Sequence, residues 1–316
     1  MLSTKIGVGE SHAKLILLGE HAVVYGQPAI ALPVSLLKMT VTLSASRYGQ
    51  YIEDNEMRRR LELMDDDFEG IRQLILRLLD KFDSRQMPFS LEIDSNIPRG
   101  RGLGASAALA TAVTKAFFDY FEAALSEKEL LYFTNFSETI MHGRASGIDA
   151  ATVNSEKPLW FVREGETEPL DIDLSAFLVI GDSGIRGLTT QAISVVQQKL
   201  KEFPEKVEAG IEKLGSLVYE ARDTLLSGDI ETLGNVFNAS QAILKNLGVS
   251  HRKLDQLIEV ALSRGALGAK LTGSGLGGVM IALAATERDA IRISQALSRN
   301  GAQNTWIFSL DPKNNL

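Results

Sequence analysis

The sequence predicts a protein of mixed strands and helices in two parts, and three observations support this. The chain has 316 residues, which suits one large or two medium-sized domains. Its first half mixes strand-like and helix-like segments, whereas residues 189–264 have the pattern of four successive amphipathic helices. A polar, acidic connection at 164–173 separates these halves and is the predicted domain boundary.

The elements of the first half follow from apolar runs, alternation and one helix cap. A helix over 68–82 is predicted because apolar residues recur at helical spacing. A second helix, rich in Ala and Leu, is expected to start near Ala105. The pattern Ser-x-x-Glu at Ser126 is a capping box, so a third helix should begin there. The charged segment 48–67 is predicted to be a surface excursion. Strands are predicted at 15–18, 29–34, 37–43, 88–94 and 158–163.

The second half is predicted to be largely helical and to end on strands. Pro204, Gly228 and Gly248 separate the four helices, which are expected at 189–203, 206–227, 229–247 and 251–264. Thr286 is the predicted N-cap of a last helix that extends to residue 300. Further strands are predicted at 176–180, 279–283 and 304–310.

Composition and charge exclude several classes of function. The chain has no cysteine, which excludes disulfides, thiolate catalysis and cysteine-based zinc sites. A net charge of −7 argues against nucleic acid or an anionic membrane surface as the main partner. The four histidines lack the spacing of metal ligands, and no apolar run approaches the roughly 18 residues of a membrane span. With no targeting pattern at the N-terminus, we expect a cytoplasmic protein.

A glycine-rich loop at 98–106 is the stretch around which the chain is organised. It joins the predicted strand 88–94 to the helix starting near Ala105 and carries three glycines, two arginines and a serine. The helix would direct its free N–H groups and positive dipole end at the loop, an arrangement that suits phosphate. An ordinary strand-to-helix connection is the alternative. The loop lacks the lysine of a Walker A motif and the glycine spacing of a dinucleotide-binding loop.

Other candidate residues stand where burial or glycine content needs an explanation. Glu20 and His21 directly follow an apolar strand, where charge is costly without a partner. The second glycine-rich loop, 268–279, is predicted to lie close to a ligand. Glu138 falls late in its helix, which is unfavourable for a carboxylate and points to a partner cation. Asp149 follows a glycine turn and is a candidate helix N-cap, base or metal ligand.

Three stretches, in this order and spacing, resemble the signature motifs of the GHMP kinase family: Lys14 to Gly26, Pro98 to Ala108 and Lys270 to Gly278. The segment from His142 to Asp149 is similar to a fourth stretch of that family. The resemblance implies an α+β fold with two domains. Residues 1–172 would form an N-terminal domain like domain 2 of ribosomal protein S5, and residues 173–316 a ferredoxin-like, helix-rich C-terminal domain.

The activity implied by the resemblance is ATP- and Mg²⁺-dependent phosphorylation of the 5-hydroxyl of mevalonate, a step of isoprenoid biosynthesis. The alternatives are another small-molecule kinase of the family, such as one that acts on phosphomevalonate, and a sensor that binds nucleotide without catalysis. Retention of Lys14, Ser106, Glu138 and Asp149 together argues against the sensor. We expect no nucleic-acid or membrane partner, and the sequence leaves open whether the protein forms a homodimer.

The resemblance also implies roles for single residues. Asp149 and Lys14 would be catalytic, with Lys14 stabilising the charge that develops on the attacking hydroxyl. Ser106 and Glu138 would bind Mg²⁺, and substrate contacts would come from Lys14, Glu20, His21, Asp149 and Thr190. The nucleotide would be held by Pro98, Gly100, Arg101, Gly102, Leu103, Gly104, Ala105, Ser106, Ala107, Gly273, Ser274 and Gly275.

Two departures from the family pattern affect the site. Trp160 stands where a basic residue is expected, so the cation that anchors the substrate carboxylate is not evident. Arg163 and Arg144 are candidates because a carboxylate favours a bidentate cation, although either could equally be a surface residue. Leu276 stands where the animal members have glycine.

Overall fold

The computed structural model describes residues 5–54, 57–143, 146–165, 167–172, 174–187 and 189–311, except for the side chain of His142. Within these, the chain forms two compact units that are interleaved along the sequence. The first contains residues 1–13, 35–97 and 104–155, and the second contains 14–34, 98–103 and 156–316. No single cut separates the two units, and the predicted domain boundary at 172/173 stays a prediction.

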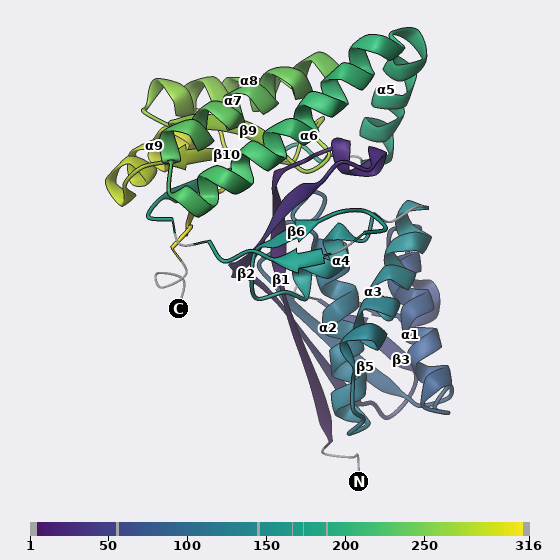
Figure 1. Cartoon of the computed structure of the whole chain (residues 1–316). Coiled ribbons are helices and arrows are strands. Elements are labelled where there is room, and N and C mark those ends of the chain that lie inside the picture. Colours follow the sequence, from purple (N-terminus) through teal and green to yellow (C-terminus); the bar gives the residue numbers. More distant parts are fainter. Residues whose placement is uncertain are drawn as a thin grey trace. The chain divides into compact units, whose positions relative to one another are not determined.

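The first unit contains a sheet covered by helices (Figure 1). Its strands are ordered β4-β3-β5-β2, and β1 also pairs with β2. Strands β2 and β5 are antiparallel, with Val41 opposite Ile93, whereas β3 and β5 are parallel. The elements are β1 (Ile6–Leu18), β2 (Ala29–Ala45), β3 (Gln50–Glu53), β4 (Arg58–Arg60), β5 (Phe89–Ser95), α1 (Glu69–Lys81), α2 (Ala105–Tyr120), α3 (Glu127–His142), α4 (Ile148–Val153) and the short 3-10 helices Leu61–Leu63 and Asp66–Phe68.

Helix α2 is the central helix of this unit. It packs so closely against β1 that β1 must carry small residues at the contact. A Cβ atom on Gly9 would lie 2.0 Å from the backbone oxygen of Ala112, so only glycine fits there. Helices α1, α3 and α4 all pack against α2, which is buried along most of its length. The loop in front of α2 therefore leads into a firmly held helix.

The second unit is a four-stranded antiparallel sheet of order β11-β8-β10-β9 with helices packed on it. Helices α8 and α9 pack beside each other on this sheet, and α7 lies along the edge strand β9 (Figure 1). The end of β1 from residue 14, the first part of β2 and strands β6 and β7 also belong to this unit. The elements are β6 (Leu159–Phe161), β7 (Thr167–Pro169), β8 (Phe177–Asp182), α5 (Thr189–Glu202), α6 (Pro204–Ser227), α7 (Ile230–Leu247), α8 (Arg252–Ser263), β9 (Gly268–Thr272), β10 (Val279–Ala284), α9 (Glu287–Arg299), β11 (Thr305–Ser309) and the 3-10 helix Ala22–Tyr25.

Most predicted elements are confirmed, and the exceptions have a common cause. Helix α3 begins at the predicted capping box of Ser126, and α9 begins after Thr286. The segment 48–67 is not only a surface excursion, because it contains β3 and β4. Strand β7 likewise lies inside the predicted acidic connection. Both β4 and β7 are end strands of their sheet, where polar and charged residues are tolerated.

Candidate functional site

The glycine-rich loop at 98–104 leads directly into the first turn of α2. Gly100, Gly102 and Gly104 all have positive φ, between 68° and 79°, a conformation that glycine adopts readily. Gly104 is the N-cap of α2 and has no side chain with which to cap the helix, so the first N–H groups of α2 are left for a ligand. This geometry fits phosphate, because these groups carry the positive end of the helix dipole.

Arg101 connects this loop to strand β8. Its Nε atom lies 2.9 Å from Oδ1 of Asp182, whose side chain is fully buried. Its Nη2 atom also donates to the backbone oxygen of Gly184 and to Oε1 of Gln303, each at 3.1 Å. The structure therefore gives Arg101 a role in fixing the loop, which the sequence did not indicate, and its contact with a nucleotide stays a prediction.

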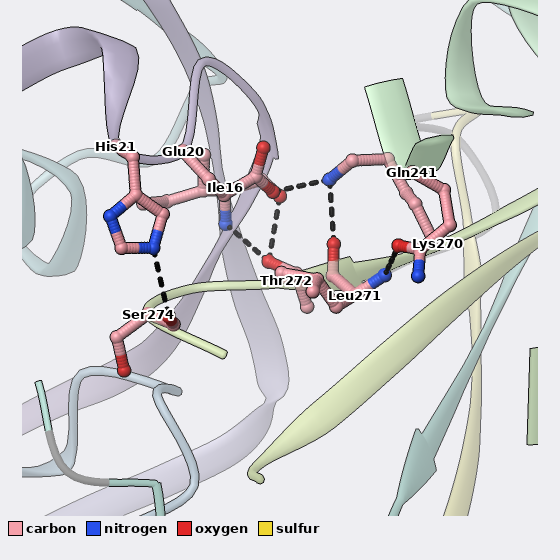
Figure 2. Close-up of polar contacts among 8 residues, drawn as sticks. All are labelled: Ile16, Glu20, His21, Gln241, Lys270, Leu271, Thr272 and Ser274. Carbon is pink, nitrogen blue, oxygen red and sulfur yellow. Dashed lines mark hydrogen bonds and ion pairs between the residues drawn. The ribbon is translucent and has the colours of Figure 1, made fainter. Parts of the chain in front are cut away.

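Three of the sequence motifs meet inside the second unit. The backbone nitrogen of Lys14 donates to the oxygen of Leu103, at 3.0 Å. Oγ1 of Thr272 donates to the backbone oxygen of Ile16 at 2.7 Å and accepts from its nitrogen at 3.1 Å (Figure 2). Close approach also joins the two glycine-rich loops, since a Cβ atom on Gly102 would lie 3.7 Å from the Cα atom of Gly273. The first strand motif is therefore in contact with both loops.

Glu20 and Lys270 form an ion pair in which both side chains are fully buried (Figure 2). Burial raises the pKa of the Glu20 carboxyl above its usual value, and the charges of Lys270 and Lys14 oppose that shift. Burial lowers the pKa of Lys270, which Glu20 opposes. The family resemblance implies that Glu20 binds substrate. The structure instead shows its carboxylate bound to Lys270, and the substrate contact stays a prediction.

His21 is held in a strained backbone conformation. Its φ and ψ are 60° and −44°, and the nitrogen of Ala22 donates to the oxygen of Glu20 at 2.7 Å, which closes a γ-turn with positive φ. Such turns are rare and costly in residues other than glycine, and they concentrate at functional sites. The ring is buried, and its Nε2 lies 2.8 Å from the backbone oxygen of Ser274. Because a carbonyl only accepts, Nε2 carries the proton and Nδ1 is the acceptor.

Acidification is expected to destabilise the protein through His21. Burial lowers the pKa of its ring below the ordinary value of 6.5, so the unfolded chain binds a proton more readily than the folded one. The contribution of neutral His21 to the free energy of unfolding is therefore complete above the ordinary value of 6.5 and is lost as the pH falls below it. Between about pH 8 and about pH 5, the melting temperature should fall less for His21→Asn than for the unmodified protein, because Asn has no ring to protonate. Asn is chosen because it tolerates positive φ. Equal losses in both proteins would contradict this role of His21.

Ser106 and Glu138 are brought together in the first unit, and their binding of Mg²⁺ stays a prediction. Oγ of Ser106, in the first turn of α2, donates to Oε1 of Glu138 near the end of α3, at 2.5 Å. A hydroxyl and a carboxylate fit Mg²⁺, which takes oxygen ligands and usually keeps several waters and phosphate oxygens. Over the described part of the chain, no group of three or more acidic or histidine side chains is arranged to hold a metal ion. A Mg²⁺ ion held by these two side chains would take its other ligands from water or phosphate oxygens.

The two predicted catalytic residues belong to different units. Asp149 is half-buried in the first turn of α4, in the first unit, and Lys14 is buried on β1, in the second. The N-cap of α4 is Gly147, so the N-cap alternative for Asp149 is wrong. Helix α4 packs against both α2 and α3, which carry Ser106 and Glu138. Asp149 is therefore placed on a short helix whose position depends on the two that hold the proposed metal ligands.

Thr190, the remaining predicted substrate residue, and Arg163, one of the two candidate carboxylate anchors, lie in the second unit. Thr190 is exposed in the first turn of α5, and its neighbour Thr189, which sequence analysis did not single out, donates from Oγ1 to Oγ of Ser274 at 3.4 Å. Arg163 donates to the backbone oxygen of Val24 at 3.2 Å, and Arg144, the other candidate anchor, lies outside the described residues. Trp160 is buried, and the guanidinium of Arg222 lies over its ring, at 4.8 Å from the ring centre. This cation–π contact accommodates an aromatic residue at that position.

Comparisons with known proteins match both halves of the chain. The model described as "GHMP kinases N terminal domain" matches residues 70–155, and that described as "GHMP kinases C terminal" matches 221–303. Mevalonate kinase of Pyrococcus furiosus is 32% identical over 91% of this chain and 93% of its own. Two solved structures are also similar. The mevalonate kinase of methicillin-resistant Staphylococcus aureus is 34% identical, with a TM-score of 0.75, over 98% of this chain and 100% of its own. The mevalonate kinase of L. major in complex with R-mevalonate is 25% identical, with a TM-score of 0.82. The match covers 98% of this chain and 97% of its own.

The loop in front of the helix N-terminus fits phosphate, and the matches to both GHMP kinase models and to mevalonate kinases identify an ATP-dependent kinase. Family models match both halves of the chain, and a relative that is 32% identical covers 91% of it. The chain therefore belongs to the GHMP kinase family. Among the described helices, none has both the length and the apolar character needed to cross a membrane.

Proposed function

We propose that this kinase transfers the γ-phosphoryl group of ATP to the 5-hydroxyl of mevalonate. The observation that carries the proposal is the similarity over nearly the full chain to mevalonate kinases, including one solved with R-mevalonate. The motif Gly19-Glu20-His21 after the strand that contains Lys14 supports it, because a strand that runs into Gly-Glu-His-Ala-Val-Val resembles that class in particular. We also propose that the enzyme acts in the cytoplasm and divides into functional domains at 172/173.

The proposed roles follow the chemistry of phosphoryl transfer, which depends on positioning and charge stabilisation. The loop at 98–106 and the N-terminus of α2 bind the phosphates, and residues 273–275 cover them. Ser106 and Glu138 hold Mg²⁺, which when bound neutralises charge on the phosphates. Asp149 orients the acceptor hydroxyl and takes its proton late in the transfer. Lys14 stabilises the charge that develops on the acceptor oxygen, since an alcohol has a pKa far above that of Asp.

The identity of the acceptor is tested by supplying ATP with a small panel of alcohols. The panel contains mevalonate, phosphomevalonate, homoserine and galactose, and the measurement is kcat/KM for each from ADP release. We expect the highest value with mevalonate. Preference for phosphomevalonate would favour the alternative kinase of the same family. ATP binding without turnover of any alcohol would favour the sensor.

Removing the charge of Glu138 is expected to raise the Mg²⁺ requirement. Glu138→Gln keeps the size of the side chain but provides a neutral amide, a weaker ligand for a hard cation. We expect the Mg²⁺ concentration for half-maximal activity to rise by about tenfold or more. The reason is that a contact with a charged group contributes about 1.5–3 kcal/mol. The measurement is initial rate against Mg²⁺ at saturating ATP. The matched control is Glu129→Gln, which alters the capping box of the same helix far from Ser106. An unchanged Mg²⁺ curve for Glu138→Gln would remove it as a ligand.

A further inference from the structure

The buried ion pair of Glu20 and Lys270 joins two of the motifs and serves neither the proposed catalysis nor the proposed metal site. Glu20 lies in the turn after β1, and Lys270 lies in β9, immediately before the glycine-rich loop 273–278. Both side chains are fully buried. Nζ of Lys270 also donates to the backbone oxygen of Leu271, at 2.7 Å (Figure 2).

Stability alone does not account for this pair. Burying two charges costs several kcal/mol per ion, and well-packed apolar residues of similar volume are often as good or better. The other carboxylate oxygen of Glu20, Oε2, is buried without a hydrogen-bond partner among the described residues. An incompletely satisfied buried charge adds to the cost. A role in function explains why such a pair is present.

The contacts around the pair fix the start of the second glycine-rich loop. Strand β9 is the edge of its sheet, and its outer N–H groups are bound by side chains of α7, with Gln241 accepting from the nitrogen of Leu271 at 2.9 Å. On β9, the alternate side chains of Lys270 and Thr272 contact the first motif, and just beyond the strand the backbone oxygen of Ser274 accepts from His21. Alternate residues of an extended strand share one face. One face of β9 is therefore bound by the strand and turn that precede the 3-10 helix at residue 22, and the same turn binds the backbone of Ser274.

We propose that Glu20 and Lys270 are positioning residues for the nucleotide, and that their ion pair holds loop 273–278 in its phosphate-binding conformation. The inference rests on the proposed role of that loop as a cover for the phosphates of ATP. Glu20 acts through Lys270 and β9 on the start of the loop, and the hydrogen bond from His21 to Ser274 supports the same segment. Loss of the pair should therefore weaken binding of the nucleotide while the acceptor is bound as before.

The test separates affinity from stability with four variants. Glu20→Gln removes one charge, Glu20→Gln/Lys270→Met removes both, and Glu20→Lys/Lys270→Glu exchanges the partners while keeping the link. Glu20→Asp is a milder change that keeps the charge but shortens its reach. The matched control is Leu257→Ala, which opens a cavity on the buried face of α8 without removing a charge. Calorimetry measures the Kd of a non-hydrolysable ATP analogue without acceptor, and kinetics give KM for ATP and for mevalonate.

The expected result is a rise of about tenfold in nucleotide Kd for Glu20→Gln and for the double neutral variant, a change typical of residues that couple through a shared element. KM for mevalonate stays within about twofold, and a smaller rise in the same direction is expected for Glu20→Asp. The exchanged pair regains much of the affinity. Leu257→Ala lowers Tm and leaves Kd unchanged.

Two results would overturn the inference. One is a double neutral variant with the nucleotide Kd of the unmodified protein, which would make the pair purely structural. The other is a rise in KM for mevalonate with unchanged nucleotide Kd, which would make Glu20 a substrate contact. A failure of the proposed acceptor would be seen separately, because the unmodified protein would then bind nucleotide without phosphorylating mevalonate.

Discussion

Asp149→Asn is expected to lower kcat by about two to four orders of magnitude, the usual contribution of a positioned general base. The amide has nearly the shape of the carboxylate but neither its charge nor its basicity, so it cannot take the proton of the acceptor hydroxyl. ATP binding depends on the glycine-rich loops and the N-terminus of α2 rather than on this side chain. We therefore expect the Kd of an ATP analogue to change little, while pre-steady-state rates of ADP formation fall with kcat.

The control for this experiment is another aspartate at a helix N-terminus. Asp229 is the exposed N-cap of α7, and its carboxylate accepts from the nitrogen of Thr232 at 3.0 Å. Asn is an equally good N-cap, so Asp229→Asn should leave both kcat and Tm close to their original values. Asp149 also lies in the first turn of its helix, where a carboxylate contributes about 0.3–1 kcal/mol through the dipole. Turnover by Asp149→Asn close to that of the unmodified protein would exclude Asp149 as the base.

Lys270→Met is expected to lower the free energy of unfolding by about 3–5 kcal/mol, because it leaves the carboxylate of Glu20 buried without its cation. Adding Glu20→Gln should recover much of this loss, since no uncompensated charge remains. Urea unfolding of the four proteins in this cycle measures the coupling between the two side chains. Equal losses in Lys270→Met and the double variant would show that packing of the lysine chain, and not its charge, is what stabilises the protein.

The destabilisation by Lys270→Met should also depend on pH in a defined direction. Burial already raises the pKa of Glu20, and loss of Lys270 removes a charge that lowers it. The folded variant therefore binds a proton at Glu20 more tightly than the unfolded chain does. Its stability relative to the unmodified protein should improve as the pH falls toward the ordinary carboxyl value of 4.5 and worsen as the pH rises. A deficit independent of pH would show that Glu20 does not titrate in the variant.

Elements that depend on local interactions were predicted well from the sequence. The capping box at Ser126 and the N-cap at Thr286 each involve residues three positions apart, so their pattern is visible in the sequence itself. The start of α2 at Ala105 was also predicted, because an Ala- and Leu-rich helix follows a run of glycines. The contact of Ser106 with Glu138 was expected only through the family resemblance, since 32 positions separate them.

Elements that depend on pairing between distant segments were predicted less well. The sequence predicts a glycine-rich loop at 268–279, but its first five residues form β9. This strand pairs with β10, and its outer edge is bound by Asn238 and Gln241 of α7. Two strands were predicted at 29–34 and 37–43, but β2 is continuous from Ala29 to Ala45. Its first part pairs with β6 and its second with β5, and neither partner is adjacent in sequence.

The sequence by itself determined the motifs, the helix ends and the requirement that a charge after a buried strand must have a partner. Only the tertiary structure decided which partner that is. Glu20 pairs with a lysine 250 positions away, and His21 binds a backbone oxygen 253 positions away. Desolvation makes a partner necessary wherever a charge is buried, but chain folding alone brings a particular one within reach. The same reason explains why Arg101 is bound to Asp182 and fixes its loop in the fold.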